Sequence, residues 1–220
     1  MNEPLPLVIA NHKANKTWDQ LTKWIDEVGK VASAFLGTII VAPSSPFLNS
    51  TVAQIKSKSY KLKVSSQDVS KFEQGPHTGE FAASQIADIC QFAIIGHSER
   101  REHFDENDEA LSNKVESSRH VQIEPIFCVQ NEDTHIPATV KIVAYEPIFA
   151  IGTGTPDSPE NAKRVAANIK PKGNYTVLYG GSVDDQNAKT FMQKNIIDGL
   201  LIGTKSLDAS EFIAILKALS

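Results

Sequence analysis

The chain has 220 residues, of which 41% are hydrophobic and 22% are charged, and its formal net charge is −4. This composition is typical of a globular protein with enough apolar residues for a large core. No segment approaches the roughly 18 consecutive apolar residues of a membrane helix, and no signal peptide is predicted at the start. Because no block of lysine and arginine exceeds two residues, we expect neither a nucleic acid nor a membrane as partner.

The two cysteines, Cys90 and Cys128, lie far apart and do not have the spacing of metal ligands. Their small number favours a reducing compartment, so we expect a cytoplasmic protein without a metal site.

Eight short apolar runs, most of them rich in β-branched residues, predict buried strands. They cover residues 7–10, 38–41, 62–64, 92–95, 124–129, 140–145, 176–179 and 199–202. Helical periodicity between them predicts helices over residues 18–35, 46–56, 83–90, 105–120, 158–169, 185–194 and 209–219. The tryptophans of the first helix, Trp18 and Trp24, fall on its apolar stripe and are interpreted as core residues.

Strand followed by helix, repeated about eight times, predicts a parallel sheet covered by helices. Eight units in one chain favour a single α/β domain over residues 1–220, a closed (β/α)₈ barrel. An open doubly wound sheet is the alternative, but a glycine-rich phosphate fingerprint is missing after the first strand.

The unit between the fifth and sixth strands is short. Only residues 130–139 separate these strands, and that length does not accommodate a crossover helix with its two loops. We therefore expect the crossover helix to be largely missing, with one side of the barrel thinly covered. A partner subunit would be one way to hide apolar surface exposed there.

Glu146 follows the sixth predicted strand and precedes Pro147, which has a fixed φ. Gly152 and Gly154, on the loop that follows, allow the backbone to approach a ligand closely. A carboxylate on a rigid strand end beside a glycine-bearing loop suits proton transfer, although most Glu-Pro pairs are ordinary turns.

In a (β/α)₈ barrel, functional residues follow the carboxyl ends of the strands. There the chain places Asn11 and Lys13 after the first strand, His97 after the fourth and Glu146 after the sixth. Each of these residues alone has an ordinary explanation as a solvated or hydrogen-bonded loop residue. Glycines after the sixth, seventh and eighth strands, with Ser182 and Thr204, predict backbone amides gathered around one phosphate.

These residues give the chain a resemblance to the triosephosphate isomerase family over nearly its whole length. The matching segments are residues 11–13, 67–70, 78–80, 95–101, 128, 144–154, 179–183 and 198–203. The runs Gly-His-Ser-Glu-Arg-Arg and Ala-Tyr-Glu-Pro are specific in combination, whereas Gly-Gly-Ser alone is not.

The resemblance implies interconversion of dihydroxyacetone phosphate and glyceraldehyde 3-phosphate without a metal or an organic cofactor. Glu146 would be the base, His97 would stabilise the enediolate oxygen, and Lys13 and Asn11 would hold the substrate.

The resemblance also implies that the amides of Gly152, Ser182, Gly203 and Thr204 bind the phosphate. It gives Glu99 and Cys128 supporting places near the site, although a pairing of Glu99 with Lys13 or an arginine explains that residue equally well.

Several positions depart from the family pattern. Phe149 stands where tryptophan is usual, Pro156 interrupts a run that usually lacks proline, and Thr204 replaces a second glycine. After Cys128 the usual Gly-Glu is Val-Gln-Asn. None of these changes removes a group that performs chemistry.

A protruding loop over residues 72–81 also has a counterpart in the family, where it docks into a second subunit. We therefore expect a homodimer through this loop, and the short fifth unit leaves a tetramer open. Two other functions remain to be separated by assay: a different phosphate-binding barrel isomerase, which would need another base, and a non-catalytic binder of phosphorylated ligands.

Overall fold

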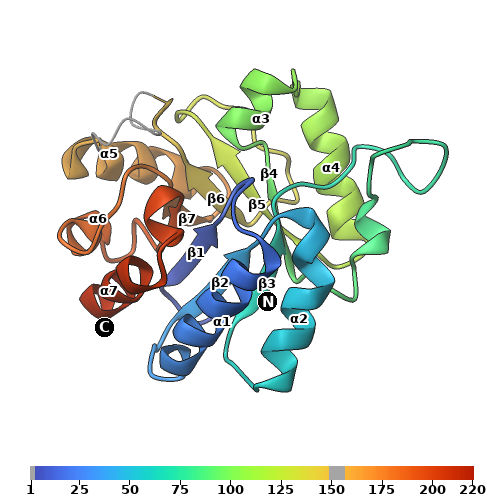
Figure 1. The fold of residues 1–220 in the computed structure, drawn as a ribbon. Helices are drawn as coiled ribbons and strands as arrows, with labels where there is room; N and C mark the ends of the chain where they lie inside the picture. The colour runs from blue at the N-terminus through green and yellow to red at the C-terminus, as the bar shows by residue number, and fades with distance from the viewer. Residues whose placement is uncertain (1–2, 149–156) are drawn as a thin grey trace.

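The computed structural model describes residues 3–148 and 157–220, and within them eight parallel strands close into a barrel (Figure 1). The strands are β1 (Leu7–Asn11), β2 (Thr38–Ala42), β3 (Lys63–Ser66), β4 (Phe92–Ile95), β5 (Glu124–Val129), β6 (Ile142–Tyr145), β7 (Thr176–Tyr179) and β8 (Gly199–Ile202). Because β1 pairs with both β2 and β8, the sheet has no free edge. The predicted (β/α)₈ barrel is confirmed, and the open doubly wound sheet is excluded.

Helices surround the barrel (Figure 1). They are α1 (Trp18–Ala32), α2 (Leu48–Ser57), α3 (Ser98–His103), α4 (Asp108–His120), α5 (Pro159–Ile169), α6 (Ala188–Phe191) and α7 (Ala209–Leu219). Short 3₁₀ turns are η1 (Ser45–Phe47), η2 (Ala83–Gln85), η4 (Lys170–Lys172) and η5 (Thr204–Ser206). None of the helices in the two described segments is long and apolar enough to cross a membrane.

Side chains of each strand alternate between the barrel interior and the layer beneath the helices. In β1, Leu7 and Ile9 belong to the interior cluster, whereas Val8 belongs to the outer one. Ile142 and Ala144 of β6 are likewise interior residues. The alternation therefore directs Glu146, two residues beyond Ala144, toward the axis at the open end of the barrel.

Helix α1 begins at a capping box and packs one apolar face into the core. The side chain of Thr17 accepts the backbone N–H of Gln20, and the side chain of Gln20 accepts the backbone N–H of Thr17, which together form a capping box. The apolar stripe packs inward, and the indole N–H of Trp24 donates to the carbonyl of Ser206 at 2.9 Å. Trp24 is a core residue, as predicted, and Trp18 packs partly buried against the same core.

Two predicted helices are largely wrong. Only η2 forms within residues 83–90, because Ile86 leaves the helical conformation while it packs into the core. Only α6 forms within residues 185–194, because Asp184 and Asn187 tie their side chains to each other's backbone N–H and hold a turn there. The helix begins after Asn187 and ends at Phe191, where Met192 becomes extended.

Helix α3 was not predicted, and α4 begins later than expected. Residues 98–103 are polar without an apolar period, so no pattern indicates α3. Asp105 has a φ of 51°, which ends any helix there, and Asn107 caps the start of α4 through its side chain.

The short fifth unit is confirmed, since none of residues 130–141 lies in a helix. The expected exposure of apolar surface is wrong, however, because every residue of β5 is buried. Ile136 packs against the outer core, and the guanidinium of Arg101 lies over the ring of Phe127 at 5.6 Å. This side of the barrel therefore provides no reason to expect a partner subunit.

Candidate active site

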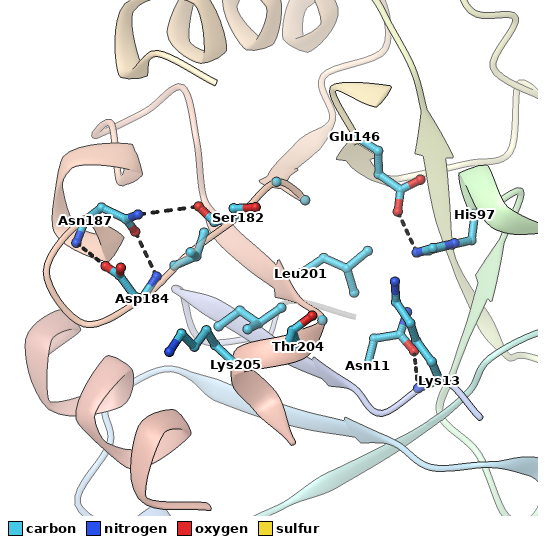
Figure 2. Close-up of a pocket in the computed structure, with 15 residues that line it drawn as sticks. Asn11, Lys13, His97, Glu146, Ser182, Asp184, Asn187, Leu201, Thr204 and Lys205 are labelled. Atoms are coloured by element: carbon cyan, nitrogen blue, oxygen red, sulfur yellow. Dashed lines mark hydrogen bonds and ion pairs between the residues drawn. The ribbon is translucent and has the colours of Figure 1, made fainter. Parts of the chain in front are cut away.

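A cavity of about 420 Å³ opens at the carboxyl-terminal end of the barrel (Figure 2). It brings together predicted site residues from the loops after β1, β4, β6, β7 and β8. These are Asn11, Lys13, His97, Glu146, Ser182, Gly203 and Thr204. Gly152, the remaining predicted phosphate ligand, lies outside the described residues.

Glu146 is fixed at the end of β6 and is almost completely buried, with 1% of its surface exposed. Its backbone N–H donates to the carbonyl of Val129 at 2.8 Å, which continues the pairing of β5 and β6. One carboxylate oxygen, Oε1, lies 3.1 Å from Nε2 of His97. The other, Oε2, accepts the backbone N–H of Ser98 at 2.9 Å. The carboxylate is therefore held at both oxygens and shielded from water.

His97 lies between β4 and α3, and its ring caps the first turn of that helix. Nδ1 accepts the backbone N–H of Glu99 at 3.2 Å. A ring nitrogen that accepts a hydrogen bond carries no proton, so the imidazole is neutral and its proton is on Nε2. Nε2 is the nitrogen that faces Glu146 and the cavity (Figure 2). His97 therefore presents a hydrogen-bond donor to whatever occupies the cavity.

Lys13 has a φ of 51°, a conformation that costs energy for a residue with a side chain. Its backbone N–H donates to Oδ1 of Asn11 at 3.1 Å. Its carbonyl accepts from Ser44 Oγ and from Gln67 Nε2, at 2.9 and 2.8 Å. These contacts hold the strained backbone in place and fix where the ammonium group of Lys13 enters the cavity.

The ammonium group of Lys13 pairs with Glu99. Burial by itself raises the pKa of Glu99, but the hydrogen bond and charge of Lys13 outweigh it and lower that pKa. Glu99 therefore stays ionised and balances the charge of Lys13, which is the pairing considered from the sequence. Glu99 is not among the residues that line the cavity.

The side of the cavity away from Glu146 and His97 carries Ser182 and Thr204 (Figure 2). Gly180 approaches Glu146 closely: a Cβ at this position would lie 3.0 Å from Cγ of that residue. A Cβ on Gly203 would lie 3.4 Å from Cε of Lys13. Thr204 does not have a positive φ, so the threonine fits where the family often has glycine.

Cys128 is fully buried in the barrel interior and does not line the cavity. Burial, reinforced by the negative charge of Glu146, raises the pKa of its thiol well above the ordinary value. The thiol is therefore protonated and lies next to the carboxylate of Glu146, where it cannot act as a nucleophile.

Several contributors to the site were not singled out from the sequence. The backbone N–H of Ser98 binds the carboxylate of Glu146, and Asp184, Asn187, Leu201 and Lys205 add to the lining of the cavity. Ser98 belongs to the specific run around His97, but a backbone contact leaves no signal in residue type. Within residues 3–148 and 157–220 no group of three or more histidine, cysteine or acidic side chains is arranged to hold a metal.

A closed parallel barrel with a buried carboxylate, a neutral imidazole and a lysine at its carboxyl-terminal mouth defines a (β/α)₈-barrel enzyme of the acid–base type. Comparison with known proteins gives the family. The family model for triosephosphate isomerase matches residues 6–219.

Individual members of this family align with the chain along nearly their whole length. Triosephosphate isomerase of Aquifex aeolicus is 35% identical over 242 aligned positions, which cover 95% of this chain and 97% of the relative. Those of Mesomycoplasma hyopneumoniae and Alcanivorax borkumensis are each 34% identical and cover 96% and 97% of this chain, and 98% of each relative. The chain belongs to the triosephosphate isomerase family. Because the alignments are longer than the chain, these relatives carry residues that it lacks.

Proposed function

We propose that this chain interconverts dihydroxyacetone phosphate and D-glyceraldehyde 3-phosphate, the step that links them in glycolysis and gluconeogenesis. The two compounds are isomers, so the reaction needs no oxidant, reductant or organic cofactor. The observation that carries the proposal is the contact of Glu146 with the neutral imidazole of His97 at the rim of one cavity.

In the proposed reaction, Glu146 takes a proton from the carbon next to the carbonyl group. The electron pair of that C–H bond forms the carbon–carbon double bond of an enediolate, and the carbonyl π electrons move to oxygen. The proton then returns from Glu146 to the neighbouring carbon. Burial favours this step because it keeps bulk water away from the carboxylate and from the reacting carbons.

His97 donates its Nε2 hydrogen bond to the oxygen on which negative charge develops, and it transfers protons between the two oxygens. A weakly acidic C–H gives up its proton only if that charge is stabilised at the same moment. This division of roles between a glutamate base and a neutral histidine is the established chemistry of the family.

Lys13 supplies positive charge for the phosphate and the enediolate oxygen, and Asn11 orients the substrate. Glu99 holds Lys13, and Cys128 lies beneath the base. Backbone amides of Gly152, Ser182, Gly203 and Thr204 bind the phosphate. That binding is remote from the reacting carbons, so its energy can be used to hold the substrate in the reactive position.

We also propose that the protein is a homodimer in the cytoplasm, associated through residues 72–81, with a tetramer left open. This loop projects from the barrel (Figure 1), and most of its residues are exposed. At its base the half-exposed ring of Phe72 stacks on His77 with centroids 4.1 Å apart. The cytoplasmic assignment is supported by two free, buried cysteines, Cys90 and Cys128.

The reaction is tested with a coupled assay in which the purified protein converts glyceraldehyde 3-phosphate and a dehydrogenase consumes the dihydroxyacetone phosphate formed. We expect turnover without added metal and in the presence of a chelator. Phosphate binding with no turnover would favour the non-catalytic binder, and turnover of a different phosphorylated sugar only would favour another barrel isomerase.

A further inference from the structure

Tyr145 and Tyr179 are the last residues of β6 and β7, and both contact one buried aspartate, Asp157. The hydroxyl of Tyr145 donates to Oδ2 of Asp157 at 3.2 Å. The backbone N–H of the same aspartate donates to the hydroxyl of Tyr179 at 3.1 Å. Asp157 is 5% exposed, and both tyrosines are buried. A single residue therefore contacts the last residue of β6 and the last residue of β7.

The two tyrosines occupy matched positions in neighbouring strands. Tyr145 and Tyr179 are register partners, and the N–H of Gly180 donates to the carbonyl of Tyr145 at 2.8 Å. Glu146 follows the first tyrosine, and the glycines that line the cavity follow the second. A shift of either tyrosine therefore moves one side of the site relative to the other.

The space around these strand ends leaves little freedom. A Cβ on Gly181 would lie 2.1 Å from the hydroxyl oxygen of Tyr179, so this glycine rests directly on that hydroxyl. Gly180 packs closely against Glu146 in the same way, since a Cβ on Gly180 would lie 3.0 Å from Cγ of Glu146. Small movements of β6 against β7 are consequently transmitted to both the base and the glycine segment.

Asp157 is itself anchored to a helix. Its Oδ1 accepts the N–H of Ser158 at 2.8 Å, and its Oδ2 also accepts Nδ2 of Asn161 at 2.8 Å. Ser158 caps α5, so the carboxylate is tied to the first turn of that helix. A buried carboxylate is tolerated only when hydrogen bonds replace its water, and here three donors, on Tyr145, Ser158 and Asn161, do so.

We propose that Asp157 is a positioning residue of the active site, which holds the ends of β6 and β7 together so that Glu146 stays aligned with the phosphate-binding segment after β7. The proposal rests on the isomerase function proposed above. It assigns Tyr145 to the alignment of the base and Tyr179 to that of the phosphate segment.

The test compares Tyr145→Phe, Tyr179→Phe, Asp157→Ala and the double variant Asp157→Ala with Tyr145→Phe. Tyr145→Phe is expected to lower kcat roughly tenfold with KM unchanged, because small displacements of a base cost about this much. Tyr179→Phe is expected to raise KM and weaken the binding of inorganic phosphate by a similar factor. Asp157→Ala removes the acceptor of Tyr145 but keeps the backbone N–H that binds Tyr179. It is therefore expected to lower kcat as Tyr145→Phe does, and the double variant should have the same kcat as Asp157→Ala alone.

A purely structural role predicts a different outcome. If Asp157→Ala lowers the melting temperature while kcat, KM and the phosphate dissociation constant stay within twofold of wild type, the proposal is overturned. Asp157→Asn retains one acceptor oxygen and is expected to lose less than Asp157→Ala. It also keeps the test decisive if the alanine variant does not fold. Asp185→Ala, on an exposed aspartate of a neighbouring loop, is the matched control.

Two readouts do not depend on turnover, so failure of the isomerase assignment and failure of this proposal can be told apart. Calorimetric binding of inorganic phosphate compares the variants whether or not the protein is an isomerase. Burial, followed by the charge of Asp157, raises the pKa of Tyr145, so ultraviolet titration should show one tyrosine ionising at lower pH in Asp157→Ala. An unchanged titration curve would contradict the contact on which the proposal rests.

Discussion

The imidazole Nε2 of His97 lies 3.1 Å from Oε1 of Glu146, although the two residues follow different strands, β4 and β6. The backbone N–H of Ser98 binds the other carboxylate oxygen, Oε2. The proposed base and the proposed electrophile are thus both held by one short segment at the start of α3. A substrate carbonyl placed between them would meet a proton acceptor on one side and a hydrogen-bond donor on the other.

His97→Asn tests the role of the donor. Asparagine is too short to present its amide where Nε2 lies, so the developing oxyanion loses its hydrogen bond. We expect kcat to fall by at least about a hundredfold, the scale of one lost oxyanion donor or one general acid, while inorganic phosphate binds as in wild type. His103→Asn, on an exposed residue of the same helix, should retain full turnover. Equal losses in both variants would mean that α3 as a whole was disturbed.

Gly180→Ala tests the close approach to Glu146 of the loop segment that follows β7. The added Cβ would lie 3.0 Å from Cγ of Glu146 and 3.2 Å from the carbonyl oxygen of Tyr145. Both contacts are shorter than a Cβ normally makes, so Glu146 must shift, and we expect kcat to fall by roughly ten- to a hundredfold. Steady-state kinetics with thermal unfolding as a folding check measure this, and an unchanged kcat would show that the base tolerates displacement.

His12→Phe tests the acid stability of the fold. His12 is fully buried, its ring lies edge-on to Trp24 at 4.5 Å, and neither ring nitrogen has a hydrogen-bond partner of good geometry. Burial, with the charge of Lys16, lowers the pKa of His12 to about 3. The unfolded chain binds a proton at this residue below pH ~6.5, whereas the folded protein does so only near 3.

Between these two values the unfolded state holds more protons, so the free energy of unfolding falls as the pH is lowered. His12→Phe removes this contribution, and the loss of stability from pH 7 to pH 4.5 should shrink by on the order of 2 kcal/mol. Urea unfolding at both pH values measures the difference. His135→Phe, at an exposed histidine, should keep the wild-type dependence of the unfolding free energy on pH. If His12→Phe also kept it, His12 would not be its source.

The association state tests the role proposed for residues 72–81. Light scattering at micromolar concentration should give about twice the chain mass of 24.0 kDa. Phe72→Ala removes the ring that stacks on His77 and should shift the population toward monomer. Leu36→Ala, at a side chain that is 90% exposed elsewhere on the surface, should leave the dimer intact. A monomeric wild-type protein would remove the proposal.

The barrel could be predicted because its strands are continuous buried runs. β4, β5, β7 and β8 begin and end at the residues that the apolar pattern indicates. Helices were predicted well where an apolar stripe and a cap coincide, as in α7, which Asp208 caps through its side chain. The helices expected over 83–90 and 185–194 failed because core packing of Ile86 and the Asp184–Asn187 hydrogen bonds override local propensity.

The site could be predicted as far as the topology determines it. Parallel strands of a closed barrel bring their carboxyl ends to one rim, so Asn11, Lys13, His97 and Glu146 had to meet there. Asp157 could not be found in this way. Its importance depends on the register of Tyr145 with Tyr179 and on backbone groups, and residue types carry no trace of either.

The most direct test of the account is the turnover of Glu146→Asp. Shortening the side chain by one methylene group withdraws the carboxylate from the reacting carbon but keeps its charge. We predict that kcat falls by at least about a hundredfold while the affinity for inorganic phosphate stays nearly the same. Glu160→Asp, at an exposed position of α5, should have no effect. A Glu146→Asp enzyme with wild-type kcat would contradict the assignment of Glu146 as the base.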